Sequence, residues 1–310
     1  MAHSSAQPIQ AQLAKLGLST EESPSLATER GKTYFSSVAH NEQGEAFFVK
    51  ASLAQEPDVL RSLANEIYIL KKITNLNNGG HVILPELIKG RVGKKFVWHV
   101  REYLEGHNFG DWKSGFSAPV LANLQFAKKL ALGIYYLQVN LLGTADEKQL
   151  SMRKTEHILK DGKALAKKLA REAVITEKTS EAVAKKMEST GIQESPVFCH
   201  GSIEPKNILR QGKNVGLINW KNAVISNPAM DLASVWVYAL REKKWQDEFI
   251  NSYLELSSNQ SIVEKYLDIE KIYRVLHTLN RFKEESRISS IQGEKKRFFA
   301  LLIKTLQELV

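Results

Sequence analysis

The stretch from Val197 to Ala233 reads VFCHGSIEPKNILRQGKNVGLINWKNAVISNPAMDLA and carries most of the information about the fold. Within it, short apolar runs alternate with glycine, proline and asparagine, which is typical of short strands joined by tight loops. The sequence on both sides has apolar residues at helical spacing instead. We therefore predict a compact β region inside a mostly helical part of the chain.

The sequence before residue 105 has a different pattern, in which strand-like runs surround one helix. Strands are expected at 33–40, 45–52, 84–90 and 96–103, where β-branched and aromatic residues are frequent. The turn Asn41-Glu42-Gln43-Gly44 predicts that the first two form a hairpin. Leu60, Leu63, Ile67 and Leu70 mark the apolar face of a helix expected from Val59 to Ile73.

The sequence after residue 105 predicts mainly helices. We expect a long buried helix from Val120 to Leu142, a pair of charged helices between 146 and 189, and further helices from 231 to 310. The predicted organisation is a flexible tail (1–20), an N-terminal β-rich lobe (21–104) and a C-terminal helical lobe (105–310) with a charged helical region near 146–189.

Composition limits the classes of function. The 310 residues carry a formal net charge of +9, which favours anionic ligands such as nucleotide phosphates. No segment is apolar for long enough to span a bilayer, so no membrane insertion is expected. Without a recognisable secretory signal and with Cys199 as the single cysteine, we expect a cytoplasmic protein. No zinc-type Cys/His spacing or RNA-binding aromatic signature is present, so nucleic acid is not the expected partner.

The Val197–Ala233 stretch resembles the central signature of the aminoglycoside phosphotransferase and choline kinase family. The matching residues are His200-Gly201, Pro205, Asn207-Ile208-Leu209, Ile218 with Trp220, and Pro228 with Asp231-Leu232-Ala233. The resemblance implies an α+β, two-lobed protein kinase-like fold with a small β-rich N-lobe and a larger, mostly helical C-lobe. It also implies structural roles for His200, which holds the loop, and for Asp231, which caps a helix or holds that loop.

The resemblance extends upstream and implies a nucleotide site. Lys50, at the end of a strand, matches the family's phosphate-binding lysine, and Glu66, on the next helix, matches its ion-pair partner. The backbone of Glu102, Tyr103 and Leu104 matches the hinge that holds an adenine ring. ATP or another nucleotide is the cofactor implied, and a loop at 29–33 is the candidate for covering its phosphates.

The sequence departs from the family at two decisive positions. Ser202 stands where the family has its catalytic aspartate, and Asn219 stands where it has its metal-binding aspartate. Serine cannot accept a proton at neutral pH, and asparagine offers magnesium an oxygen without a charge. Asn207, the other expected metal ligand, is neutral as well, so magnesium binding is expected to be weak or absent.

Three functions remain open from the sequence. The leading interpretation is a pseudokinase-like, catalytically impaired member that binds a nucleotide or regulates a small-molecule or protein partner. The alternative is an active ATP-dependent small-molecule phosphotransferase in which Glu204, two residues after Ser202, or an unorthodox metal site replaces the lost acids. The third is a binder of nucleic acid or membrane surfaces through basic patches at Lys163, Lys167, Lys168 and Arg171 and at Lys295, Lys296 and Arg297. Acidic residues interleave with the first patch, which favours an ordinary solvated face.

Overall fold

The computed structural model describes residues 3–20, 25–29, 32–53, 56–74, 76, 80–142, 150–188, 194–285 and 291–310. The chain divides into two compact units. Unit 1 comprises residues 1–77, 84–105 and 217–223, and unit 2 comprises residues 78–83, 106–216 and 224–310. Each unit is described by itself below.

Unit 1 is built on a five-stranded antiparallel sheet with the strand order β1-β2-β3-β5-β4. The strands are β1 (Ser25–Glu29), β2 (Lys32–His40), β3 (Ala46–Ser52), β4 (Leu87–Val92) and β5 (Val97–Glu102). The predicted hairpin between β2 and β3 is confirmed, and Asn41 stabilises its turn by accepting from the amides of Gln43 and Glu45. The candidate loop at 29–33 joins the ends of β1 and β2 in the sequence, and its residues 30 and 31 lie outside the described residues.

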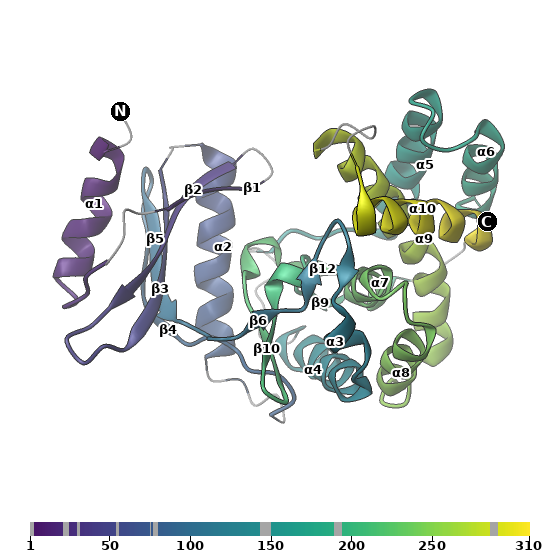
Figure 1. Cartoon of the computed structure of the whole chain (residues 1–310). Helices are drawn as coiled ribbons and strands as arrows, with labels where there is room; N and C mark the ends of the chain where they lie inside the picture. The colour runs from purple at the N-terminus through teal and green to yellow at the C-terminus, as the bar shows by residue number, and fades with distance from the viewer. Residues whose placement is uncertain are drawn as a thin grey trace. The chain divides into compact units, whose positions relative to one another are not determined.

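A helix covers each face of this sheet (Figure 1). The face towards α2 (Pro57–Ile73) packs Tyr34 and Val97 against Val59, Leu63 and Ile67, which confirms the predicted helix. Because side chains alternate along a strand, Phe35, next to Tyr34, points to the opposite face. There it joins a second apolar cluster that includes residues of α1 (His3–Ala14).

The presence of α1 changes the interpretation of the N-terminus. A flexible tail is expected from the sequence over residues 1–20, but Ile9 and Leu13 are buried beside Phe35, Val49 and Trp98. The two side chains are four residues apart, so they lie on one side of the helix and close the outer face of the sheet. The end of this segment also pairs with the sheet, since Ser19 and His40 exchange backbone hydrogen bonds.

Unit 2 is mostly helical, as predicted. Its helices are α3 (Ala118–Leu121), α4 (Leu124–Leu142), α5 (Thr155–Arg171), α6 (Glu177–Lys186), α7 (Ala229–Tyr238), α8 (Lys243–Leu254), α9 (Gln260–Glu285) and α10 (Gly293–Leu309). Helices α5 and α6 pack together and form the charged helical pair expected near 146–189. Helix α9 packs against α5, α7 and α10.

Short strands lie among these helices. They are β6 (His107–Asn108), β7 (Gly110–Asp111), β8 (Gly115–Phe116), β9 (Val197–Cys199), β10 (Ile208–Gln211), β11 (Asn214–Leu217) and β12 (Val224–Ser226). Strand β9 pairs with β12, and β10 lies between β6 and β11. The compact β region predicted from the Val197–Ala233 stretch is therefore present, and the fold is α+β with a small antiparallel sheet and a larger helical part.

Two further predictions need correction. The long helix expected from Val120 to Leu142 is divided into α3 and α4, because Asn123 accepts a hydrogen bond from the amide of Gln125 and begins a new helix. The segment 217–223, expected within the C-terminal lobe, belongs to unit 1. Asn65 of α2 holds it there by donating to the carbonyl oxygens of Lys221 and Ala223, at 3.1 and 3.0 Å.

None of the helices in the described ranges is long and apolar enough to cross a membrane.

Candidate functional site

Lys50 and Glu66 form a buried ion pair in unit 1. Lys50 Nζ lies 2.9 Å from Glu66 Oε2, and the two residues are 7% and 1% exposed. Strand β3 presents Lys50 on the face covered by α2, which carries Glu66, so the pair follows from strand alternation and helix packing. Burial raises the pKa of Glu66, but the charge of Lys50 and the neighbouring His99 together outweigh it and hold this pKa well below its usual value. The predicted ion pair is therefore present, with the Glu66 carboxylate ionised.

Two basic side chains of the neighbouring strand β5, His99 and Arg101, lie near this ion pair. His99 of β5 is the register partner of Lys50, and its Nε2 lies 3.6 Å from Glu66 Oε2. Burial lowers the pKa of His99 despite the attraction of Glu66, so its imidazole is neutral at pH 7. Burial also lowers the pKa of Arg101, to about 10, which leaves its guanidinium charged. The positive charge near Glu66 thus comes from Lys50 and Arg101.

The candidate hinge follows β5 directly. The amide of Glu102 donates to the carbonyl oxygen of Glu86 at 2.9 Å, and its carbonyl oxygen accepts from Arg101 Nη1 at 2.8 Å. Both backbone groups of Glu102 are therefore engaged within unit 1. Leu104 is buried, whereas Tyr103 is partly exposed.

Asn219 lies in the same unit, beside Lys50. Its backbone adopts the left-handed conformation, with φ of 70°, which asparagine and aspartate tolerate better than most residues. Its Oδ1 accepts a hydrogen bond from Lys50 Nζ at 3.1 Å. The Asn219 side-chain oxygen, which the resemblance places at the metal site, thus accepts a hydrogen bond from the Lys50 ammonium group.

Lys221, two residues after Asn219, is a buried cation that the sequence analysis did not single out. It belongs to the short helix η2 (Trp220–Asn222) and is 6% exposed. Its Nζ lies 4.5 Å from the centre of the Tyr34 ring, and Lys50 Nζ lies 5.2 Å from the centre of the same ring. The segment that lacks the expected aspartate therefore contributes a lysine to the surroundings of Lys50.

The loop after β9 carries the remaining candidates, and its conformation depends on Asp231 of α7. The Asp231 carboxylate accepts from the amides of His200 and Gly201, at 2.7 and 3.0 Å. Gly201 has φ of 75°, a conformation that favours glycine and allows this tight turn. Burial raises the pKa of Asp231 to about 6, against the opposing effect of the two amides. Asp231 thus holds the loop, the role that the family resemblance implies.

Ser202 and Asn207 contact each other within this loop. Asn207 Nδ2 donates to the Ser202 carbonyl oxygen at 2.8 Å and lies 3.4 Å from the Ser202 hydroxyl. The amide of Ser202 in turn donates to His200 Nδ1 at 3.3 Å, so His200 makes a structural contact. Both candidates are buried, and Ser202 offers a hydroxyl where the resemblance implies the family's catalytic aspartate.

Glu204, the candidate substitute for the lost acid, is paired with Arg281 of α9. Arg281 Nη1 lies 3.0 Å from Glu204 Oε2, and both side chains are largely buried. Arg281 also pairs with Glu285 at 2.7 Å and stacks on Trp112, 4.0 Å from its ring centre. A carboxylate held by a guanidinium is a weaker proton acceptor than a solvated one, because the opposite charge favours its ionised form.

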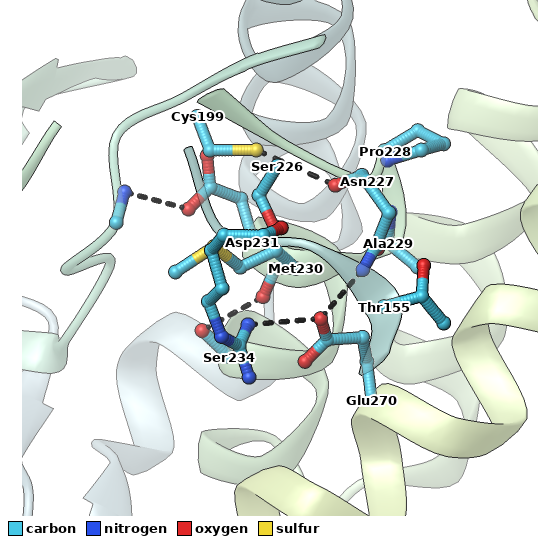
Figure 2. Close-up of polar contacts among 12 residues, drawn as sticks. Thr155, Cys199, Ser226, Asn227, Pro228, Ala229, Met230, Asp231, Ser234 and Glu270 are labelled. Atoms are coloured by element: carbon cyan, nitrogen blue, oxygen red, sulfur yellow. Dashed lines mark hydrogen bonds and ion pairs between the residues drawn. The ribbon is translucent and has the colours of Figure 1, made fainter. Parts of the chain in front are cut away.

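A polar network behind the loop joins it to α9 (Figure 2). Glu270 of α9 accepts from Arg153 Nη1 at 2.9 Å and from Asn227 Nδ2 at 2.7 Å. The backbone oxygen of Asn227 accepts from the Cys199 thiol at 3.4 Å, which links β9 to the start of α7. Burial raises the pKa of Cys199 well above its usual value, so its thiol remains protonated and serves packing.

The donor groups of the candidate metal positions are neutral amides. Asn219 contacts Lys50 in unit 1, and Asn207 contacts Ser202 in unit 2. In the described ranges, no three His, Cys, Asp or Glu side chains gather in a way that could hold a metal ion. Magnesium prefers anionic oxygen ligands, so these residues do not fit it well.

Comparison with known proteins identifies the class. Residues 38–262 match the family model described as the phosphotransferase enzyme family, and the chain belongs to this family. No curated protein matches the chain.

Solved structures of phosphotransferases share the fold. A macrolide 2'-phosphotransferase type I superposes with a TM-score of 0.65 at 15% identity, covering 97% of this chain and 96% of its own. The GDP complex of aminoglycoside 2'-phosphotransferase-IIIa gives a TM-score of 0.62 at 16% identity and 97% coverage of both chains. The GDP and kanamycin complex of a related aminoglycoside phosphotransferase gives 0.62 at 14% identity, covering 97% and 98%.

Proposed function

We propose that this chain binds a nucleotide through unit 1 and transfers phosphoryl groups poorly or not at all, and that it acts as a nucleotide-binding or regulatory protein. The observation that carries this proposal is the contrast between a retained charge pair, Lys50 with Glu66, and two replaced carboxylate positions, Ser202 and Asn219. Membership of the phosphotransferase family and the GDP named for two structural neighbours support the nucleotide part.

Nucleotide binding requires a fixed cation for the phosphates and polar backbone groups for the base. Glu66 fixes the Lys50 ammonium group, which contributes to phosphate binding as a point charge. Since the backbone of Glu102 is engaged, we assign contact with the base to the backbone of Tyr103 and Leu104. ATP and GTP are therefore the first ligands to test.

The impairment of transfer follows from the loss of a base and of an anionic metal ligand. Proton transfer by a positioned group contributes roughly 10²–10⁴-fold to rate, and the serine hydroxyl at position 202 cannot replace it. The alternative, an active small-molecule phosphotransferase using Glu204, is less well supported because Arg281 already holds that carboxylate. The lone, buried Cys199 is compatible with a reducing cytoplasm, and the regulated partner is a small molecule or a protein.

Calorimetric titration with ATP, GTP and adenosine tests the proposal. The double variant Lys50→Met/Glu66→Gln removes the cation without leaving a buried carboxylate unpaired. We expect the original protein to bind at least one triphosphate and the double variant to bind it at least 10-fold more weakly. Lys72→Met is the matched control, since Lys72 is an exposed lysine near the Tyr68 ring in the same unit. Equal binding by the original protein and the double variant would contradict the proposal, as would no binding of either triphosphate by the original protein.

A further inference from the structure

The surroundings of Lys50 contain a second cation where a phosphotransferase of this family would use a metal. Asn219, at the metal position, is neutral, and its oxygen faces Lys50 Nζ at 3.1 Å. Polyphosphate carries several negative charges and needs compensation from more than one cation. Lys221 comes from the same short segment as Asn219 and brings its ammonium group to the Tyr34 ring that Lys50 also contacts.

We propose that Lys221 takes the charge-neutralising role of the missing divalent cation, so that Lys50 and Lys221 together bind the polyphosphate of a nucleotide without metal. This inference rests on the proposed function and specifies how the same site works. Unit 1 supplies all of its parts: Lys50 from β3, Tyr34 from β2, and Asn219 with Lys221 from the segment 217–223.

The position of Lys221 is fixed by the protein. Asn65 donates to the carbonyl oxygen of Lys221 at 3.1 Å and to that of Ala223 at 3.0 Å, which ties η2 to the helix that carries Glu66. Trp220, between Asn219 and Lys221, is fully buried and anchors the same turn. The backbone that carries Lys221 is therefore fixed by the packing of unit 1, and its ammonium group lies against the same Tyr34 ring as that of Lys50.

The Tyr34 ring offsets part of the cost of burying two ammonium groups. An aromatic ring attracts an ammonium group through its negative face, and this attraction is stronger where water is excluded. Lys50 and Lys221 are both more than nine-tenths buried, and both lie within about 5 Å of the ring centre. An anion that reaches both ammonium groups would gain from both charges, whereas a divalent cation near them would be repelled by both.

The test is calorimetry with ATP and with inorganic tripolyphosphate, each in EDTA and in excess magnesium. We expect the original protein to bind both ligands in EDTA, and magnesium to change the affinity less than threefold. Lys221→Gln should weaken ATP binding in EDTA at least 10-fold, while Lys221→Arg, which keeps the charge, should restore most of it. Lys72→Gln, in which an exposed lysine near the Tyr68 ring is neutralised, should bind like the original protein.

The outcomes separate this inference from the proposed function. ATP binding that is the same in Lys221→Gln and in the original protein would refute the role of Lys221 and leave the nucleotide site standing. Binding that appears only with magnesium would refute metal-free recognition. Failure of tripolyphosphate to displace ATP from the original protein in EDTA would refute it without any variant, so the test does not depend on Lys221→Gln folding. No binding of any nucleotide in either buffer would overturn both proposals.

Discussion

The residues around Lys50 in unit 1 and the Ser202 loop in unit 2 both resemble the phosphotransferase family, but they differ in whether the charged side chains are present. Around Lys50 the charged pair itself is present, with Lys50 Nζ and Glu66 Oε2 at 2.9 Å. In the loop, the backbone bonds to Asp231 are present, but Ser202 stands at the position that the resemblance assigns to the family's catalytic aspartate. On the proposed function, the contacts that shape both regions are kept and the groups that would perform transfer are replaced.

The difference shows that the backbone of the Ser202 loop is held without a carboxylate at position 202. Asp231 holds the loop through the amides of His200 and Gly201, and Glu270 holds Asn227 behind it; neither needs an aspartate at position 202. Lys50 and Glu66, in contrast, are buried charges that need each other, because an unpaired buried charge is costly. The following predictions test how far the two regions depend on their charges.

The largest loss of folding stability is expected from Lys50→Met. This change leaves the Glu66 carboxylate buried without its main partner, so we expect the free energy of unfolding to fall by about 3–5 kcal/mol. Replacing both residues, in Lys50→Met/Glu66→Leu, should recover most of this loss. Urea unfolding measures all three proteins, with Lys72→Met as the exposed-lysine control. A loss below 1 kcal/mol for Lys50→Met would mean that the pair is open to water.

A smaller effect is expected from Arg281→Met, which leaves Glu204 without its guanidinium partner. Since this pair is slightly more exposed than Lys50 with Glu66, we expect a loss of about 2 kcal/mol in the free energy of unfolding. Adding Glu204→Gln to Arg281→Met should restore part of the stability. If Arg281→Met has no effect on urea unfolding, Glu204 is solvated and becomes available as a base.

The raised pKa of Asp231, which holds the loop after β9, predicts that the free energy of unfolding depends on pH. The pKa of Asp231 is raised to about 6 from 3.8, so the folded protein binds a proton that the unfolded chain releases. Stability from this group therefore increases as pH falls through 6. Relative to Asp231→Asn, the original protein should gain about 1 kcal/mol of unfolding free energy between pH 7 and pH 5. Urea unfolding at both pH values gives the difference, and no change relative to Asp231→Asn would show that the carboxylate is ionised throughout.

The smallest effect is expected on the charged helices of unit 2. Lys168 of α5 pairs with Glu284 of α9 at 2.9 Å, but both side chains are exposed, and such pairs contribute little. Thermal unfolding of Lys167→Gln/Lys168→Gln should therefore resemble that of the original protein. A large decrease in melting temperature would mean that this surface supports the packing of α5 on α9.

Much of the fold and part of the site could be predicted from the sequence. Strand and helix patterns predicted the elements that carry Lys50 and Glu66, and the family resemblance implied that these two residues pair and that Asp231 caps a helix or holds the loop after His200. Both contacts are present in the structure.

Contacts that depend on tertiary packing were not predictable in the same way. Arg281 lies 77 residues after Glu204, and no local pattern relates the two. The sequence predicts a flexible tail over residues 1–20, and only the apolar outer face of the sheet explains the burial of Ile9 and Leu13. Lys221 lies within the Val197–Ala233 stretch, but its proposed role depends on its contact with the Tyr34 ring, which is distant in the sequence.

Nucleotide turnover tests the central claim most directly. It is measured with ATP and GTP in magnesium for the original chain, Ser202→Asp, Asn219→Asp and Ser202→Asp/Asn219→Asp, with Lys50→Met/Glu66→Gln as the background. The left-handed backbone at position 219 accepts aspartate, so this change should not disturb η2. We predict that the original chain turns over no more nucleotide than Lys50→Met/Glu66→Gln. Ser202→Asp/Asn219→Asp should hydrolyse nucleotide measurably, and faster than either single variant. Robust turnover by the original chain, lost on Glu204→Gln, would contradict the account.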